Sequence, residues 1–271
     1  GLDGIAGAGK TKQLISEAVQ SGIFESSDDE AKFPYLSTIG SQYPFNDSSG
    51  GTPHNDYQVT ATLINMLQQT GDPRLPVYAR PAAATKTYVG KAYGANDFGG
   101  GYDAYSFPGA KVYSPTFPGY IMSYAEVAFD LAEAAERGFI SGSPADYYNK
   151  GVLASMQFWG VSDDDANAFL QKNPYKDLNS IATQKWVALY NQGLEAWFER
   201  HSLFANKKGA SFFVAPAISL DPNIDLNKII VPYRISYPIA EQGQNRTNYN
   251  AAIQALGGTD SKAIELWWQL N

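Results

Sequence analysis

The chain has 271 residues, of which 44% are hydrophobic and 14% aromatic, and its formal net charge is −7. An acidic chain without a basic run does not favour nucleic-acid binding, which needs clustered Lys and Arg. The absence of Cys excludes disulfides and zinc–thiolate sites, and no apolar run approaches the roughly 20 residues of a membrane span.

The N-terminal residues 4–11, GIAGAGKT, match the phosphate-loop pattern G-x-x-x-x-G-K-T, and residues 10–19 after them are predicted to form a helix. A phosphate loop needs a buried strand before its first Gly, but only three residues precede Gly4. No later apolar strand ends in an Asp to hold magnesium, and no alternation of strands and helices predicts a parallel sheet. We therefore interpret the string as a Gly-rich segment leading into a helix.

The segment 86–118 combines many Tyr with many Gly, and it follows a loop at 33–52 and a predicted helix at 57–67. A loop of this length inside a compact domain tends to be functional. Aromatic rings bind the flat apolar face of a sugar, and nearby Asn and Asp exchange hydrogen bonds with its hydroxyls. The candidate ligand-binding residues are Tyr93, Asn96, Phe98, Tyr102, Asp103, Tyr105 and Tyr113. The alternative is that these rings only pack the loop onto the scaffold.

The clearest predicted helix spans residues 122–139. Ser123 and Glu126 predict a capping box at its start, and Gly138 suits the left-handed position at its end. Ser143 begins a second helix that ends at Gly160, and the short connection predicts an antiparallel hairpin.

Three further helices are predicted after this hairpin. Ser162 caps a short helix at 163–171, Ser180 begins a long helix, and the last helix spans 247–256. The long helix carries an apolar stripe that is best interpreted as core packing, formed by Trp186, Leu189, Tyr190, Gly193 and Trp197. Residues 211–235 are predicted to be extended pieces broken by Pro.

A glycosidase would need a pair of carboxylates across a sugar site. The candidates are Glu126, Glu133, Glu136, Glu195 and Glu199. All lie on predicted helices, where caps and solvated faces are the commoner roles. His54 and His201 are the only histidines and neither lies in a motif, while residues 163–165 lack the Gly and Glu of a calcium loop. We assign no catalytic residue, metal or cofactor.

Several stretches match one known family in order. They are DPRLPVYA at 72–79 with YVG at 88–90, MSYAEVAFDLAEAAERGFISGSPADYYNKGVLASMQFWGV at 122–161, IATQKWVALYNQGLEAWFERHSLF at 181–204, and RISYP at 234–238 with Glu241 and Asn245. These stretches resemble the SusD/RagB family of outer-membrane nutrient-binding lipoproteins. The resemblance runs from about residue 14 to residue 268.

The resemblance implies a mainly α-helical, tetratricopeptide-like scaffold of helix pairs with a large irregular ligand face and few short strands. It implies a binding protein, not an enzyme, at the cell surface of the outer membrane. Its ligand would be an oligosaccharide, or a peptide in some branches, delivered to a TonB-dependent SusC-like transporter.

The family is about twice as long as this chain, so residues 1–271 are expected to be a single region from the C-terminal part of a longer protein. The lipid-bearing Cys that anchors the family to the membrane is not in this sequence. No strict ligand motif carries over, so the aromatic loop residues remain the candidates. Two alternatives stay open: a peptide-binding or protein-interaction helical module, and a glycoside hydrolase.

Overall fold

A computed structural model describes residue 7 and residues 9–46, 57–92, 101–205 and 232–266. This part of the chain is mainly helical, as the sequence predicts. The helices are α2 (Lys10–Ser21), α3 (Ala61–Thr70), α4 (Leu75–Tyr78), α5 (Tyr124–Glu136), α6 (Pro144–Trp159), α7 (Asp163–Lys172), α8 (Leu178–Ala188), α9 (Gly193–Ala205), α10 (Ile239–Gln244) and α11 (Arg246–Ala255). The strands are β1 (Ala31–Phe33) and β2 (Gly119–Met122), which pair antiparallel.

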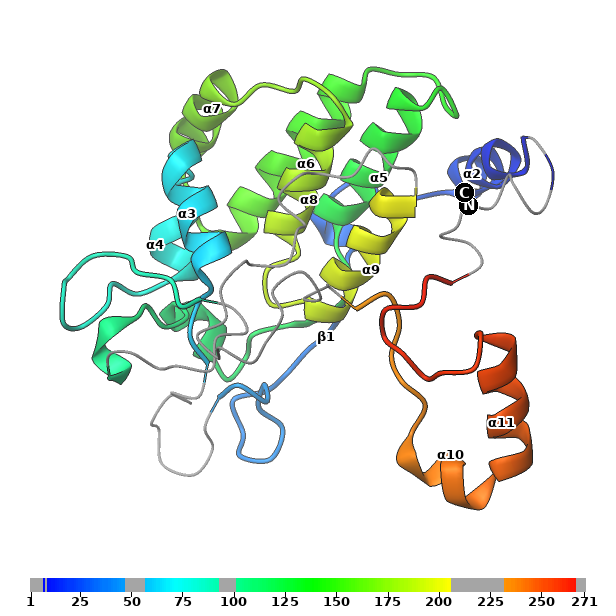
Figure 1. Ribbon diagram of the computed structural model, residues 1–271. Coiled ribbons are helices and arrows are strands. Elements are labelled where there is room, and N and C mark those ends of the chain that lie inside the picture. The colour runs from blue at the N-terminus through cyan, green and yellow to red at the C-terminus, as the bar shows by residue number, and fades with distance from the viewer. Residues whose placement is uncertain (1–6, 8, 47–56, 93–100, 206–231, 267–271) are drawn as a thin grey trace.

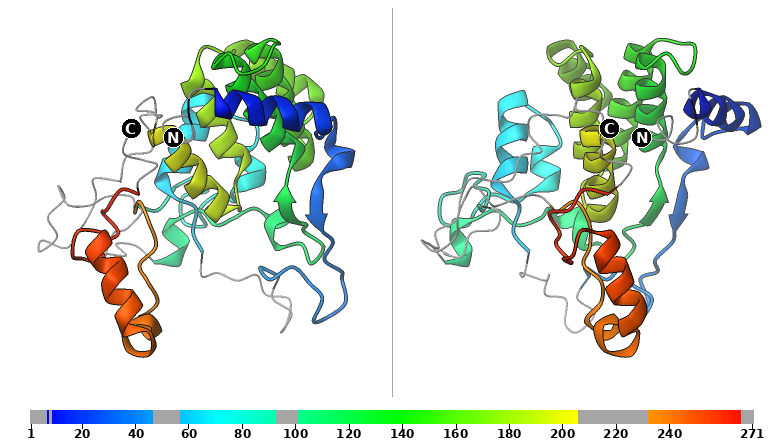
Figure 2. Two further views of the ribbon diagram at one scale, coloured as in Figure 1. Left: turned by 90° about the vertical axis from the view of Figure 1, so that its right-hand side faces the viewer. Right: turned by 45° about the vertical axis from the view of Figure 1, so that its right-hand side comes forward.

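Helices α5, α6 and α8 lie side by side and form the centre of the molecule (Figure 1). Helix α7 contacts α6, and the pair α3–α4 lies on the far side of α8 from α5 (Figure 1). The α10–α11 hairpin projects away from these layers in every view (Figure 2). The helical layers therefore form one scaffold against which the irregular segments are held.

The α5–α6 hairpin has the helix ends that the sequence predicts. Ser123 Oγ accepts a hydrogen bond from the backbone N–H of Glu126 at 3.1 Å, and Ser143 Oγ does the same at the start of α6. Gly138 and Gly160 have φ of 71° and 82°, as a left-handed helix end requires. The glutamate half of the capping box is not seen, since Glu126 Oε2 is buried with no partner among the described residues.

Small residues let α5 and α6 approach closely. A Cβ added to Gly151 on α6 would lie 2.9 Å from ring atoms of Phe129 on α5, so only glycine fits there. Buried residues of α5 to α8 complete this core: Phe129, Ala132, Tyr148, Val152, Met156, Ala166, Phe169 and Ile181. A second core lies between α3, α4, α8 and the end of α6, formed by Val59, Leu63, Ile64, Leu67, Leu75, Tyr78, Ala79, Val112, Phe117, Trp159 and Val187.

The prediction of one long helix from Ser180 is wrong. Asp177 caps α8, because its Oδ1 accepts from the N–H of Ser180 at 3.0 Å, and a turn then separates α8 from α9. Asn191 has φ of 71° in this turn, a left-handed conformation that Asn tolerates better than most residues. The stripe from Trp186 to Trp197 is therefore divided between two helices.

Other boundaries also differ from the sequence-based prediction. Helix α3 begins at Ala61, several residues later than predicted, because Thr60 Oγ1 accepts from the N–H of Leu63. Helices α4 and α10 were not predicted, since both are short, α4 contains Pro76 and α10 follows Pro238. The predicted extended pieces at 211–235 lie mostly outside the described residues.

Arg74 links α4 to the central helices. Its guanidinium is fully buried and binds Asp72 through two hydrogen bonds, and it also donates to Ser155 on α6 at 3.0 Å and Gln184 on α8 at 2.5 Å. Burial acts to lower the pKa of Arg74, but Asp72, together with Tyr78 and Tyr148, outweighs it and the pKa is raised overall. This polar network fixes how three helices meet.

The described residues around the phosphate-loop string do not form a nucleotide-binding fold. Residues 1–6 and 8 are outside the described residues, and α2 follows from Gly9 without a single buried side chain. The strands within the described ranges make a two-stranded antiparallel sheet rather than a parallel one. None of the described helices is long and apolar enough to cross a membrane.

Candidate functional site

The described parts of the aromatic segment ahead of β2, residues 86–92 and 101–118, are irregular, as predicted, and hydrogen bonds hold them. Ser106 donates its N–H to Val89 O at 2.7 Å, and its Oγ accepts the N–H of Val89 at 3.0 Å. The N–H of Ala84 donates to Asp103 O at 2.9 Å. These bonds tie residues 103–106 to residues 84–89 and present a 3-10 turn, Tyr102–Ala104, at the surface.

The predicted ligand-binding residues fall into three groups. Tyr102 is 68% exposed, Asp103 is also exposed and Tyr105 is half-buried, so this turn brings three of them together. Tyr113 is only 8% exposed, and the Arg80 guanidinium lies 5.7 Å from its ring centroid. The remaining predicted residues lie outside the described residues: Tyr93, Asn96 and Phe98.

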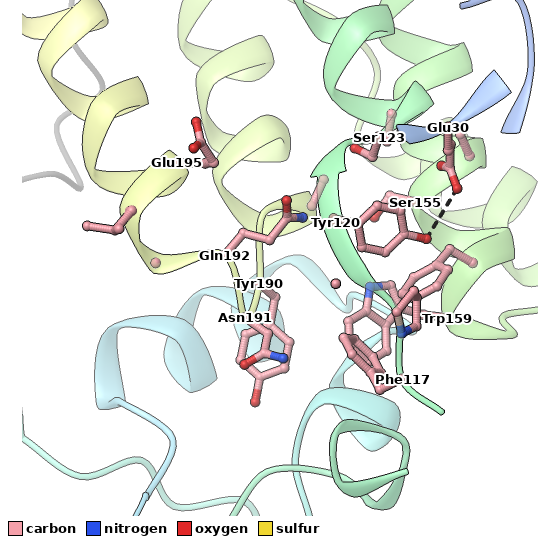
Figure 3. A pocket seen from close by; sticks show the side chains of 18 of the residues that line it. Glu30, Phe117, Tyr120, Ser123, Ser155, Trp159, Tyr190, Asn191, Gln192 and Glu195 are labelled. Atoms are coloured by element: carbon pink, nitrogen blue, oxygen red, sulfur yellow. Dashed lines mark hydrogen bonds between the residues drawn. The ribbon is translucent and has the colours of Figure 1, made fainter. Parts of the chain in front are cut away.

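The structure also contains a pocket of about 330 Å³ between β2, α5, α6 and the α8–α9 turn. Figure 3 shows Phe117, Tyr120 and Trp159 on one side of it, with Gln192 and Glu195 facing them. The aromatic residues that line it are Tyr43, Phe117, Tyr120, Phe158, Trp159 and Tyr190. Its polar lining residues are Glu30, Ser123, Ser155, Asn191, Gln192 and Glu195.

Glu30 organises the wall formed by the sheet. Its side chain is 6% exposed, Oε2 accepts from Tyr120 Oη and Oε1 from the N–H of Tyr124, both at 3.2 Å (Figure 3 draws the first). Lys32 Nζ lies 3.3 Å from Oε2. Burial, together with the adjacent Glu30 carboxylate, raises the pKa of Tyr120, so this phenol stays protonated and donates. The carboxylate thereby joins the strands to the start of α5.

Stacked rings form the floor of the pocket. The ring of Tyr190 lies 4.3 Å from that of Tyr78 at an interplanar angle of 18°, and Trp159 contacts both Phe117 and Phe158 edge-on or tilted. Tyr190 Oη donates to Tyr78 O at 2.9 Å, and burial raises the pKa of Tyr190. The floor is thus continuous with the core, to which Tyr78 and Trp159 belong.

The α8–α9 turn forms the facing wall. Asn191 Nδ2 donates to Tyr43 Oη at 2.8 Å. This bond anchors the turn to the loop that follows β1. Gln192 Oε1 is buried, and no hydrogen-bond partner for it exists among the described residues. A buried acceptor without a partner is costly. The left-handed turn therefore presents an acceptor that a ligand donor would satisfy.

Several carboxylates lie behind this wall, around Lys185. The side chain of Lys185 is buried and bonds to Asp130 and Glu199, each at 2.5 Å. Burial raises the pKa of Glu126 to about 7; Lys185 opposes the shift, while Asp130 and Glu195 add to it. One buried cation therefore faces several acids.

Three of the five candidate glycosidase carboxylates are bound by neighbouring side chains. Glu133 pairs with Arg137, Glu136 accepts from Tyr175, and Glu199 pairs with Lys185. The described residues contain no group of acids and histidines arranged to hold a metal ion. His201 is buried against Trp197, with burial lowering its pKa, and His54 is outside the described residues.

Sequence reasoning did not find the pocket because its walls come from segments far apart in the chain. Glu30, Tyr120, Ser155 and Gln192 meet only through the packing of β1, β2, α6 and the α8–α9 turn. The one available signal was the turn sequence Asn-Gln-Gly at 191–193, which lay within an apparently continuous helical pattern.

One family model matches most of the chain. Residues 4–238 match the sequence model of the SusD-like family described as starch-binding and associating with the outer membrane. A search of curated proteins found no match.

Solved structures of similar fold include a SusD homologue from Bacteroides fragilis, at 26% identity and a TM-score of 0.78, covering 98% of this chain and 63% of its own. A SusD homologue from Bacteroides thetaiotaomicron is 25% identical with a TM-score of 0.74, covering 97% of this chain and 61% of its own. A chitin-binding protein is 27% identical with a TM-score of 0.75, covering 96% and 59%. The chain therefore spans about three-fifths of the length of these structures.

Proposed function

The chain belongs to the SusD-like family, and from this membership we propose that it binds oligosaccharides at the outer membrane for delivery to a TonB-dependent transporter. Because the chain spans about three-fifths of the matched structures, the ligand, the SusC-like partner and the surface lipoprotein location are all parts of the proposal. The mechanism is binding without bond cleavage. Weak stacking contacts add up along several sugar units, and the ligand passes unchanged to the partner.

The observation that carries this proposal is the exposed ring of Tyr102 within the family-matched span. The Phe107 ring lies 6.5 Å from it at 23°, and Tyr105 and Asp103 belong to the same turn. Lys91 Nζ lies 5.6 Å from the Tyr105 ring centroid, within the range of a cation–π contact. A preordered ring stacks on a sugar with little loss of entropy. We therefore assign sugar stacking to Tyr102 and Tyr105, and hydroxyl contacts to Asp103.

Calorimetry with starch-derived and chitin-derived oligosaccharides tests this assignment. Stacking on one ring contributes on the order of 1 kcal/mol, so Tyr102→Ala is expected to weaken binding by about fivefold. Tyr237→Ala is the matched control, because Tyr237 is also exposed but lies in the segment that leads to α10. Circular dichroism checks that both variants fold.

Two results would contradict the proposal. If no saccharide binds the intact protein while an immobilised peptide library does, the chain is a peptide-binding module. If Tyr102→Ala and Tyr237→Ala weaken saccharide binding equally, the ligand face lies elsewhere. Equal amounts of sugar recovered before and after incubation support binding without turnover.

A further inference from the structure

The pocket beneath the α8–α9 turn is aromatic and acidic. Among the described residues that line it there is no Lys, Arg or His. Glu30 and Glu195 lie on its opposite walls, and the rings of Trp159 and Tyr190 line its floor (Figure 3), with their centroids 5.7 Å apart at an interplanar angle of 51°. A pocket of aromatic faces and carboxylates is the arrangement that attracts organic cations.

Three cations contact residues that line the pocket, and each already binds a partner within the protein. Lys32 pairs with Glu30, and Arg74, which donates to Ser155, is bound by Asp72. Lys111 Nζ lies 4.1 Å from the centroid of the Phe158 ring and donates to the Phe158 carbonyl. None of these groups is a lining residue of the pocket.

The facing wall carries an unpaired carboxylate and an amide oxygen without a hydrogen-bond donor among the described residues. Glu195 is exposed, and within the described ranges no cation pairs with it. Gln192 Oε1 is buried without a partner in the described part of the chain. Glu126, behind Ser123, has a buried Oε2 that is likewise unsatisfied there. A donor with positive charge would satisfy the amide oxygen and neutralise the carboxylate together.

We infer that this pocket binds a small organic cation, a protonated amine carried on a compact body, with the cation between Gln192 Oε1 and Glu195 and the body against Trp159 and Tyr190. The volume of about 330 Å³ is at the lower end of small-molecule sites, roughly 300–1,000 Å³, and suits a single sugar ring or amino acid. An amino sugar and a basic amino acid carry the same chemistry. The site is separate from the Tyr102 turn and does not rest on the proposed function.

Isothermal titration calorimetry on the intact protein at about pH 6 tests this inference, because amines are protonated there. The probes are glucosamine, its neutral counterpart N-acetylglucosamine, and lysine methyl ester. We expect at least one of the two amines to bind about tenfold more tightly than N-acetylglucosamine, and its affinity to fall as salt is raised. Glucosamine binding alone identifies an amino sugar, and lysine ester binding alone identifies a basic amino acid.

Two variants locate the site. Glu195→Gln removes the charge without altering a described contact, so it should weaken amine binding by about fivefold or more. Glu25→Gln, on an exposed side chain before β1, is the matched control and should leave it unchanged. The inference is overturned if neither amine binds, if N-acetylglucosamine binds as tightly as the amines, or if both variants bind alike. Because Tyr102→Ala leaves this pocket intact, loss of oligosaccharide binding and loss of amine binding are separable results.

Discussion

Arg74 and Asp72 form a bidentate ion pair in which both side chains are fully buried, with Nη2–Oδ2 at 2.6 Å and Nε–Oδ1 at 2.9 Å. In addition, Nη1 donates to Ser155 Oγ and Nη2 to Gln184 Oε1, so these partners also lie within the protein. A buried pair is costly to break because the remaining charge loses its only solvation. The pair therefore fixes α4 against α6 and α8.

Asp72→Ala should lower the free energy of unfolding by about 3–5 kcal/mol, since it leaves the Arg74 charge buried and unpaired. Urea denaturation of the wild type and variant measures this loss. The double variant Asp72→Leu/Arg74→Met removes both charges and should recover more than half of it. A double variant no more stable than Asp72→Ala would show that packing, not the unpaired charge, dominates.

Gly151→Ala should lower the free energy of unfolding by about 1–3 kcal/mol, because its Cβ would lie 2.9 Å from the Phe129 ring and force α5 and α6 apart. Gly243→Ala is the control, since no atom lies within 4 Å of its added Cβ and Ala favours the α10 helix. Thermal melts of the two variants give the comparison. Equal melting temperatures would mean that the Phe129 ring can move aside for the added methyl group without loss of stability.

Glu126 makes stability depend on pH. Burial raises its folded-state pKa to about 7 from an ordinary value of 4.5, so the folded protein holds this proton more tightly than the unfolded chain. The stabilising contribution is complete below about pH 4.5 and is lost as pH rises through about 7. Discounted for the part of the side chain that water reaches, it amounts to about 1–2 kcal/mol.

Glu126→Gln should remove this loss. As pH rises from 5 to 8, the free energy of unfolding of the variant should therefore increase by about 1–2 kcal/mol relative to that of the wild type. Denaturant titrations at both pH values measure the gain. Glu25→Gln, with an exposed side chain, reports how other carboxylates contribute. Identical pH profiles for the wild type and Glu126→Gln would show that Glu126 titrates normally.

Asn191 combines a left-handed backbone with a hydrogen bond to Tyr43. Asn191→Gly relieves the backbone but loses the bond, so its effect on stability should be within about 0.5 kcal/mol. Asn191→Ala loses the bond and keeps the strain, which should cost about 1–2 kcal/mol. Tyr43→Phe isolates the hydrogen bond. If Gly and Ala are equally destabilising, the left-handed turn does not determine the break between α8 and α9.

The local ends of helices could be predicted from the sequence because they depend on neighbours along the chain. Ser123, Ser143 and Ser162 cap the helices that follow them, and Gly138 and Gly160 end them. These interactions span two to four residues, so spacing alone reveals them. The same local signals identified the helical hairpin and the irregular aromatic segment.

The sequence by itself therefore determined the helical class, the α5–α6 hairpin and the family, all of which depend on local periodicity and ordered motifs. Only the tertiary structure decided that the helix after Ser180 breaks at Asn191, since Tyr43, which holds that turn, is 148 residues away. It also decided that Tyr113 is buried while Tyr102 is exposed. Only the tertiary structure formed the pocket, because its aromatic and acidic lining residues come from segments that meet only when the chain folds.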